Sequence, residues 1–510
     1  MGITIIRWYI IALLLCFGCN SSSSSKADDG GPDTSLDSGK TDDASSSFDA
    51  DSDSAGDVDG SGDWCDDIIL PPANGPDGCR RILLTKNSQG QAFITESFSP
   101  VISRDGSLVV FTAHASGHHN STEDFPKDTN EFDDVYSVDL ITMEMEVVSV
   151  SSAGEIGNDS SYAPSVTADG RYVVFLSDAT NFSENDTNNY EDIFIRDRLA
   201  GTTKLVSVSN KDEIQNGSCG SPLISADGNF IVFTSLASNL VSGDTNGKND
   251  LFIHDIEQGI TERITVANDG SEADEHAQPA IGISDDGRYI LFQHESSFAV
   301  HDTDQDDWGN YKRLDVYLYD RIAKKNTLIS IAPDGYSDTG SQAIWLSPDG
   351  TRILFQPGGA SHYHPNAVQG QMLLVTVGSD EYELVRLNEE NLIAGGRGIS
   401  DDERYVIYDS RSTGFVEHQA PTPDGRWIEN GYVTDRDTGD VFMINASEDG
   451  TPGVIPDYVP WETDMIDYVE ISMSGDGKRI VFSTIQYGIV DDCDIPCIGT
   501  PRLIYLRDCR

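Results

Sequence analysis

Short apolar runs separated by Gly, Asp and Asn turns recur along most of the chain, and residues 221–266 show this pattern most clearly. The stretch contains four runs, LIS, NFIVFTS, DLFIHD and ITERITV. A tight Asp227-Gly228 turn joins the first two, and Gly accepts the positive φ that a primed hairpin turn needs. The pattern predicts four antiparallel strands in meander order. Because one small sheet is not stable alone, we expect the stretch to be one unit of an array.

The Asp-Gly hairpin occurs seven times, at a mean spacing of about 62 residues. The copies begin at residues 99, 163, 221, 278, 342, 396 and 469. In one copy Asp402-Glu403 replaces Asp-Gly, so that turn is expected to be of another type or strained. Four strands per unit without helical periodicity predict an all-β fold, a seven-bladed β-propeller of four-stranded antiparallel blades.

The two ends of the array predict how the ring closes. The seventh unit ends at Arg510 after its third strand, while residues 80–93 match the fourth strands of other units. The N-terminal strand should therefore complete the last blade, which removes two exposed sheet edges. Elsewhere a short turn joins third to fourth strand; in the split blade these ends are Cys509 and Cys79, and we predict a disulfide between them. The other expected pairs are Cys493 with Cys497, within one loop, and, by elimination, Cys65 with Cys219.

The N-terminal part has the features of an export signal and a tether. Residues 1–19 carry one positive charge, at Arg7, and an apolar run of secretory-signal length. The end, LLLCFGC, resembles a bacterial lipobox, which implies acylation of Cys19 and an exported outer-membrane lipoprotein, on the periplasmic side or at the cell surface. The alternative is an ordinary cleaved signal peptide. Residues 20–64 are rich in Ser, Asp and Gly and predict a disordered acidic linker, which leaves residues 65–510 for the propeller.

Charge excludes some classes of partner. The chain has 86 acidic and 33 basic residues, a formal net charge of −53. This argues against nucleic acid, whose phosphates need Lys and Arg, and against docking on anionic lipid, so that the membrane is reached only through a lipid anchor. It is compatible with divalent cations, basic partners or a high-salt habitat.

Four loops between the second and third strands combine Asp, Thr and Asn or Asp with a further carboxylate at the next strand, and we call them the acidic loops. Hard cations such as calcium prefer several oxygen ligands from one tight loop. The candidate calcium ligands are Asp128, Asn130 and Asp134; Asp186, Asn188 and Asp192; Asp244, Asn246 and Asp250; and Asp302, Asp304 and Asp306. The last set has the best spacing. The alternative is that these side chains cap turns through the backbone amides of their own loops.

Histidines gather on the same expected face of the propeller, and a transition-metal site could be built around His362-x-His364. The others are His114, His118, His119, His294, His301 and His418. Because these loops belong to different blades, scattered surface histidines are the favoured interpretation. An aromatic residue that recurs once per unit, such as Phe111 or Phe233, is assigned to the core.

The S-x-D-G-x-x-x-x-F hairpin and the DIFIRD-type strand that follows it resemble the repeat of TolB-type propellers, also found in prolyl-oligopeptidase-family enzymes. The resemblance covers residues 79–510 and implies architecture rather than activity. We expect a cell-envelope lipoprotein that binds a protein or glycan partner on the face of the acidic loops, stabilised by calcium, and is more an interaction module than an enzyme. The alternatives are a cation-assisted hydrolase or lyase on that face, and a structural TolB-like component of an envelope complex.

Overall fold

The computed structural model describes residues 77–86, 96–114, 130–298, 314–333, 340–368, 370–387, 394–410, 429–446, 469–485, 489 and 502–510. The expected signal segment and linker lie outside these residues. In the described part of the chain, no helix has the length and apolar character needed to cross a membrane.

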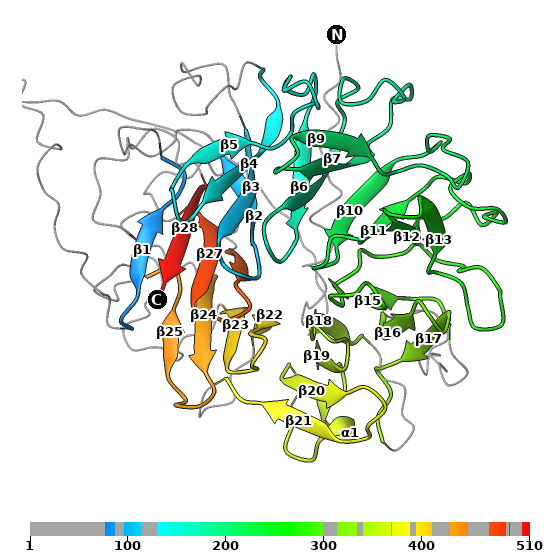
Figure 1. The fold of residues 1–510 in the computed structure, drawn as a ribbon. Helices are drawn as coiled ribbons and strands as arrows, with labels where there is room; N and C mark the ends of the chain where they lie inside the picture. Colours follow the sequence, from blue (N-terminus) through cyan, green and yellow to red (C-terminus); the bar gives the residue numbers. More distant parts are fainter. Residues whose placement is uncertain are drawn as a thin grey trace, which may run out of the picture. The chain divides into compact units, whose positions relative to one another are not determined.

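Seven four-stranded antiparallel sheets form a ring of blades, which confirms the predicted fold class (Figure 1). Each blade runs from an inner strand near the axis to an outer strand, in sequence order except in the last blade. Blades 1 to 4 are β2 (Ser97–Ile102), β3 (Leu108–His114), β4 (Asp133–Asp139) and β5 (Met145–Val147); β6 (Ser161–Val166), β7 (Tyr172–Ser177), β8 (Asp192–Asp197) and β9 (Thr202–Leu205); β10 (Cys219–Ile224), β11 (Phe230–Ser235), β12 (Asp250–Asp255) and β13 (Ile260–Arg263); and β14 (Gly282–Ile283), β15 (Tyr289–His294), β16 (Asp315–Asp320) and β17 (Lys325–Leu328). Blades 5 to 7 are β18 (Gln342–Leu346), β19 (Arg352–Gln356), β20 (Met372–Thr376) and β21 (Tyr382–Val385); β22 (Gly395–Ile399), β23 (Tyr405–Ser410), β24 (Asn430–Asp435) and β25 (Val441–Met443); and β26 (Glu470–Met473), β27 (Arg479–Thr484), β28 (Leu503–Asp508) and β1 (Arg80–Leu83). A single helical turn, α1 (Ala360–Tyr363), follows β19.

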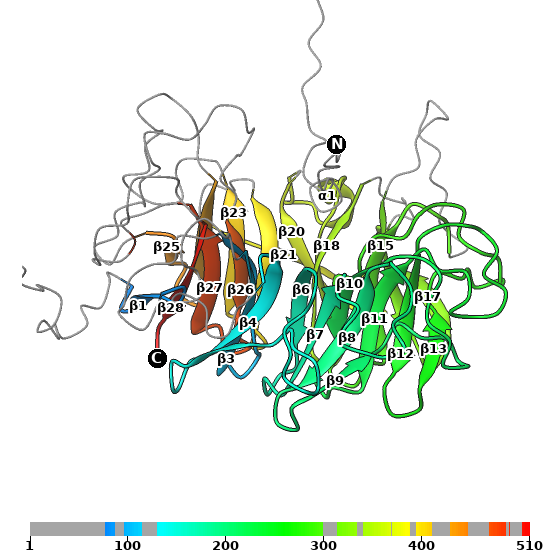
Figure 2. The same cartoon turned by 90° about the horizontal axis from the view of Figure 1, so that it is seen from above.

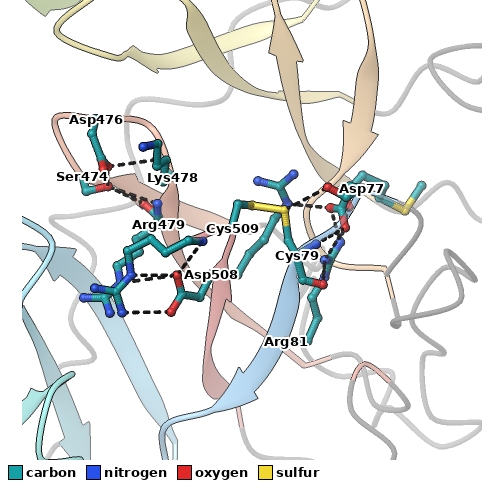
Figure 3. The surroundings of a disulfide bond; sticks show 12 residues. Asp77, Cys79, Arg81, Ser474, Asp476, Lys478, Arg479, Asp508 and Cys509 are labelled. Atoms are coloured by element: carbon teal, nitrogen blue, oxygen red, sulfur yellow. Dashed lines mark hydrogen bonds and ion pairs between the residues drawn. A yellow bond between two sulfur atoms is a disulfide. The ribbon is translucent and has the colours of Figure 1, made fainter. Parts of the chain in front are cut away.

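The N-terminal strand closes the last blade, as the repeat predicted. In Figure 2 β1 lies beside β28, and the two strands pair antiparallel from Arg80 opposite Asp508. A disulfide joins Cys79 to Cys509, the residues next to this pair (Figure 3). The buried Asp77 carboxylate accepts hydrogen bonds from Arg81 at 2.9 Å and Arg507 at 2.8 Å, so the closure is both covalent and ionic.

Apolar side chains on both faces of each sheet pack against the neighbouring blades. In six blades a ring on the second strand stacks on a ring directly opposite on the third, with interplanar angles of 19–26°. The pairs are Phe111–Tyr136, Phe175–Phe194, Phe233–Phe252, Phe292–Tyr317, Tyr408–Tyr432 and Phe482–Tyr505. All are fully buried, so the once-per-unit aromatic residue is a core residue.

A shared set of hydrogen bonds holds the hairpin that opens each blade. The first hydroxyl of every Ser/Thr-x-Asp turn donates to the Asp two residues later, at 2.6–2.8 Å. These pairs are Ser103–Asp105, Thr167–Asp169, Ser225–Asp227, Ser284–Asp286, Ser347–Asp349, Ser400–Asp402 and Ser474–Asp476. We call the propeller face that carries these turns the turn face, and the face that carries the loops from second to third strands the loop face.

The departing turn in blade 6 keeps the geometry of the other six. Glu403 has φ +60°, in the left-handed region that Gly106, Gly228 and the other turn glycines occupy at φ +65° to +76°. It is therefore the strained copy of the same turn, not a different type, because only glycine adopts this conformation without a steric cost.

Candidate functional site: the axial channel and the acidic loops

The variable residue inside each Ser/Thr-x-Asp turn lies at the wall of the central channel. The seven are Arg104, Ala168, Ala226, Asp285, Pro348, Asp401 and Gly475, and all line one cavity of about 320 Å³. The sequence pattern identifies the turn, but the ring is needed to show that these seven positions, about 62 residues apart, come together.

A circle of backbone hydrogen bonds joins neighbouring turns around this end of the channel. Each blade donates an N–H to a carbonyl of the next blade, for example Ala168 to Ala226 at 3.4 Å and Gly475 to Arg104 at 2.8 Å. Among the described residues the circle is interrupted only between Pro348 and Asp401. Pro348 has no N–H to donate, and Asp349 does not replace it as Asp105 and Asp227 do at two other junctions.

Side chains bridge that junction instead. Arg352 of β19 donates to both carboxylate oxygens of Glu403 at 2.8 Å, and also to Glu383 at 3.2 Å. At four of the six other junctions the turn glycine lies against a ring of the preceding blade: a Cβ on Gly350 would be 2.2 Å from Tyr289. At the junction of blades 5 and 6, a glutamate–arginine ion pair replaces this contact between a glycine and an aromatic ring.

Arg104 spans the channel at the turn face. Its Nη1 lies 2.5 Å from Asp285 in blade 4, and its Nε lies 2.6 Å from Asp401 in blade 6. Burial lowers the pKa of Arg104, but the hydrogen bonds to Asp401 and Asp285 outweigh this effect and leave the pKa above its ordinary value. Burial likewise raises the pKa of Asp401, and Arg104 offsets only part of the rise. The three side chains form a fixed charged bridge.

Inward from this bridge, the channel wall is mostly aliphatic. It includes Ile102, Leu223, Ile399 and Met473, with Trp345 as its one aromatic ring among the described residues. Arg397 is the second cation in the wall, and it is held by Asp409 and, at 3.8 Å, by Glu429. Apolar walls with a few fixed polar groups, in a volume of a few hundred Å³, are typical of ligand pockets.

The last carboxylate of each acidic loop is a buried structural group at the start of the third strand. Asp134, Asp192, Asp250 and Asp315 have relative exposures of 0–1%. Each accepts a hydrogen bond from a Ser or Thr hydroxyl fifteen residues later: Ser149, Ser207, Thr265 and Ser330. Asn430 takes the same place in blade 6, with Asn445 as its partner at 2.8 Å.

The middle Asn of each described acidic loop also has a local role. Asn130, Asn188 and Asn246 accept the N–H of the residue two positions later at 2.7–2.9 Å, and each amide donates to a carbonyl of the next inter-blade connection. This is the turn-capping interpretation of these residues. Asp128, Asp302, Asp304 and Asp306 lie outside the described residues.

In blade 3 a guanidinium lies among the carboxylates of the acidic loop. Arg263 Nη1 is 3.1 Å from Asp244, 3.2 Å from Asp250 and 2.8 Å from Glu272. Burial raises the pKa of Asp244 to about 6, the neighbouring Asp250 adds to the rise, and Arg263 opposes it.

In blade 2 the same loop has no such cation. Leu205 stands in the register position of Arg263, since Phe194 pairs with Leu205 as Phe252 pairs with Arg263. Burial raises the pKa of Asp192 to about 7, despite a hydrogen bond from Ser207, and nearby Asp186 adds to the rise. Burial also raises the pKa of Asp186. Among the described residues no three His, Cys, Asp or Glu side chains gather as a metal cluster.

The described histidines are dispersed and have protein partners. His114 Nδ1 lies 2.6 Å from Asp133, and the buried His294 accepts the N–H of Ser296 at 2.8 Å. His364 accepts the N–H of Asn366 at 3.2 Å, and His362 lies on α1. His118, His119, His301 and His418 lie outside the described residues.

Of the remaining cysteines, only Cys219 is described. It is a free thiol that is almost fully buried beside Ser235 at 3.5 Å, which contradicts the expected pairing with Cys65. Burial raises the pKa of this thiol. The pairing assigned by elimination was wrong because a free cysteine is also a common core residue and needs no partner. Cys19, Cys65, Cys493 and Cys497 lie outside the described residues.

Comparison with known proteins gives the fold alone. No protein-family model matches the chain, and no curated protein matches it. An oligogalacturonate lyase from Vibrio parahaemolyticus has a similar structure, at 13% identity and a TM-score of 0.49, over 86% of this chain and 95% of that one. TolB from Acinetobacter baumannii matches at 15% identity and a TM-score of 0.35, over 75% and 78% of the two chains.

A third similar structure is Pyrococcus horikoshii acylaminoacyl peptidase, at 11% identity and a TM-score of 0.43, over 77% of this chain and 49% of that one. TolB and peptidase propellers, which the repeat resembles, are thus among the matching structures. The protein is a seven-bladed β-propeller.

Proposed function

We propose that this protein is an exported, lipid-anchored binding propeller that takes a peptide segment of an envelope protein into its axial channel from the loop face. The observation that carries the proposal is the channel itself. Its turn-face end is spanned by the Arg104 bridge to Asp285 and Asp401, while its walls are mostly aliphatic. A ligand therefore meets apolar surface from the loop-face side and fixed charges at the far end.

The lining favours a peptide over a glycan. Sugars are commonly held by flat aromatic side chains, and the described wall has only Trp345 of that kind. Aliphatic side chains from Ile102, Leu223 and Ile399 suit the apolar side chains of a peptide, and the cavity volume of about 320 Å³ is at the lower end of the range for ligand pockets.

Photo-crosslinking in intact cells tests this proposal. A photoreactive residue at position 345 in the channel should capture a discrete protein partner, and the same residue at the exposed turn tip of Leu199 should not. Trp345→Ala should reduce capture from a third channel position while the unfolding temperature stays within a few degrees of wild type. Equal capture from positions 345 and 199, or capture of no protein from 345, would contradict a peptide-binding channel.

The lipid anchor is supported by the sequence at residues 1–19 and by the linker-like composition of residues 20–64. Cys19→Ser should release the protein from the membrane fraction, and mass spectrometry of the wild-type N-terminus should find acylated Cys19. A soluble wild-type protein that begins after residue 19 would show ordinary signal-peptide cleavage instead.

A further inference from the structure

We propose that blade 2 binds one divalent cation, calcium, between Asp186 Oδ1 and Asp192 Oδ2, at the place that the Arg263 guanidinium fills in blade 3.

The two loops are close structural copies. Each has the same length between the strands it joins, from Ser177 to Asp192 in blade 2 and from Ser235 to Asp250 in blade 3. Each also makes the same hydrogen bonds to the preceding inter-blade connection. Asn158 exchanges bonds with Thr180 and Asn181 as Asn216 does with Ser238 and Asn239. Equivalent residues therefore occupy equivalent places.

In blade 3 this place holds a positive group. One nitrogen of Arg263 lies within 3.2 Å of both Asp244 Oδ1 and Asp250 Oδ2. The side chains of Arg263, Asp244 and Asp250 are only 7%, 4% and 0% exposed. Buried carboxylates are stable when they are paired with a cation, and in blade 3 the chain supplies that cation itself.

In blade 2 the carboxylates remain, but their partner is absent. Leu205 replaces Arg263, and Ile214 stands where blade 3 has Glu272. Asp186 is 9% exposed and Asp192 is 0% exposed. Asp186 Oδ1 and Asp192 Oδ2, the counterparts of the two aspartate oxygens that hold Arg263, accept no hydrogen bond in the structure. The Asn188 amide donates to Gln215 at 3.1 Å, whereas its counterpart Asn246 donates to Asp250 at 3.0 Å.

The chemistry of this site favours a hard divalent cation. Two carboxylates carry two negative charges, and carboxylate oxygen is the preferred ligand of calcium, which completes its shell with carbonyls and water. The other carboxylate oxygen of Asp192 is fixed by Ser207 at 2.5 Å and Gln215 at 2.8 Å, so the free oxygen is held in position for a ligand.

Calorimetric titration of purified, chelator-treated protein with calcium chloride tests the site through its stoichiometry, because the acidic chain offers other places for calcium. Leu205→Arg recreates the blade 3 arrangement and should lower the number of tightly bound calcium ions by one. Arg263→Leu should raise that number by one. Leu205→Met, a neutral substitution of similar volume, is the matched control and should leave the number unchanged.

Thermal unfolding gives a second readout. Calcium at about a hundred times its Kd should raise the Tm of the wild type by a few degrees, and this increment should be smaller in Leu205→Arg, whose Tm in chelator should already exceed that of the wild type. An unchanged stoichiometry in a folded Leu205→Arg protein would overturn the proposal. If that variant does not fold, Asp186→Asn must lose the same calcium ion; retention of the ion would overturn it equally.

Discussion

Glu403 takes the place of a turn glycine in blade 6 and forms a two-bonded ion pair with Arg352 of blade 5, with both distances 2.8 Å. The pair joins the two blades at the junction where Pro348 cannot donate a backbone hydrogen bond. A residue that is locally strained thus makes a contact that its local sequence does not explain.

Two substitutions separate the strain at Glu403 from its ion pair. Glu403→Gly relieves the left-handed conformation, worth about 1 kcal/mol, and loses a partly exposed ion pair worth about the same or less. We expect it to change the free energy of unfolding little. Glu403→Ala keeps the strain and loses the pair, so it should be less stable than Glu403→Gly by about 1 kcal/mol. Denaturant unfolding measures both, and an alanine variant as stable as the glycine variant would contradict the account.

The charged bridge across the channel predicts a stability loss that depends on pH. Arg104→Met leaves Asp285 and Asp401 in the channel without their cation. Because these side chains are a third to a half exposed, we expect a loss of about 1–2 kcal/mol at pH 7. As the pH falls towards 4, Asp401, whose pKa burial raises, takes up a proton, so part of the loss should be recovered.

Arg171→Met is the matched control for that experiment, because it breaks an exposed Arg–Asp pair within one blade, to Asp197 at 2.7 Å. Its effect at pH 7 should be clearly smaller than that of Arg104→Met. An Arg104→Met protein whose deficit is the same at pH 7 and pH 4 would show that carboxylate repulsion is not the cause.

At acidic pH the contribution of Asp197 to the stability of the fold should be lost. The hydrogen bond from Arg171 lowers the pKa of Asp197 to about 2, below the value of an unfolded Asp. A lowered folded-state pKa stabilises the protein above the unfolded pKa, and this contribution is lost as the pH falls from about 4 to 2. The Tm difference between wild type and Arg171→Met should therefore shrink over this range; a constant difference would contradict the assignment.

The disulfide should contribute strongly to stability. Its loop spans 430 residues, for which the chain-entropy argument gives an upper figure of about 6 kcal/mol. Cys79→Ala with Cys509→Ala should unfold at clearly lower denaturant concentration than wild type, and reductant should then have no further effect. Cys219→Ala, which removes a free buried thiol, is the control. Peptide mapping of unreduced protein that finds Cys79 and Cys509 as free thiols would refute this disulfide.

The sequence allowed prediction of the blades because their signals are local. The Ser-x-Asp-Gly turn and the alternating strands lie within fifteen residues of each other, and the termini show which strand is missing. The channel lining is different, since Arg104, Asp285 and Asp401 meet only when the ring closes. No local pattern distinguishes such a residue from an exposed turn residue.

The acidic loops show the same limit. Judged by the loops alone, blades 2 and 3 offer calcium equivalent ligands. Residues outside the loops tell them apart: Leu205 or Arg263 on the fourth strand, and Ile214 or Glu272 after it. Aligning the seven units to their ends would have revealed these substitutions. Burial of Asp192 and Asp250 could not have been predicted from their polar loops, because it depends on the hydroxyls of Ser207 and Thr265.

The bond between Cys79 and Cys509 makes the order of blades cyclic. A chain whose ends are already joined has no structural need to begin at blade 7, so circular permutation should be tolerated where blades are least connected through the backbone. The junction of blades 5 and 6, with Pro348 in the hydrogen-bonded circle, is such a place. With this disulfide in place, the assembly of the propeller does not depend on the blade at which the polypeptide starts.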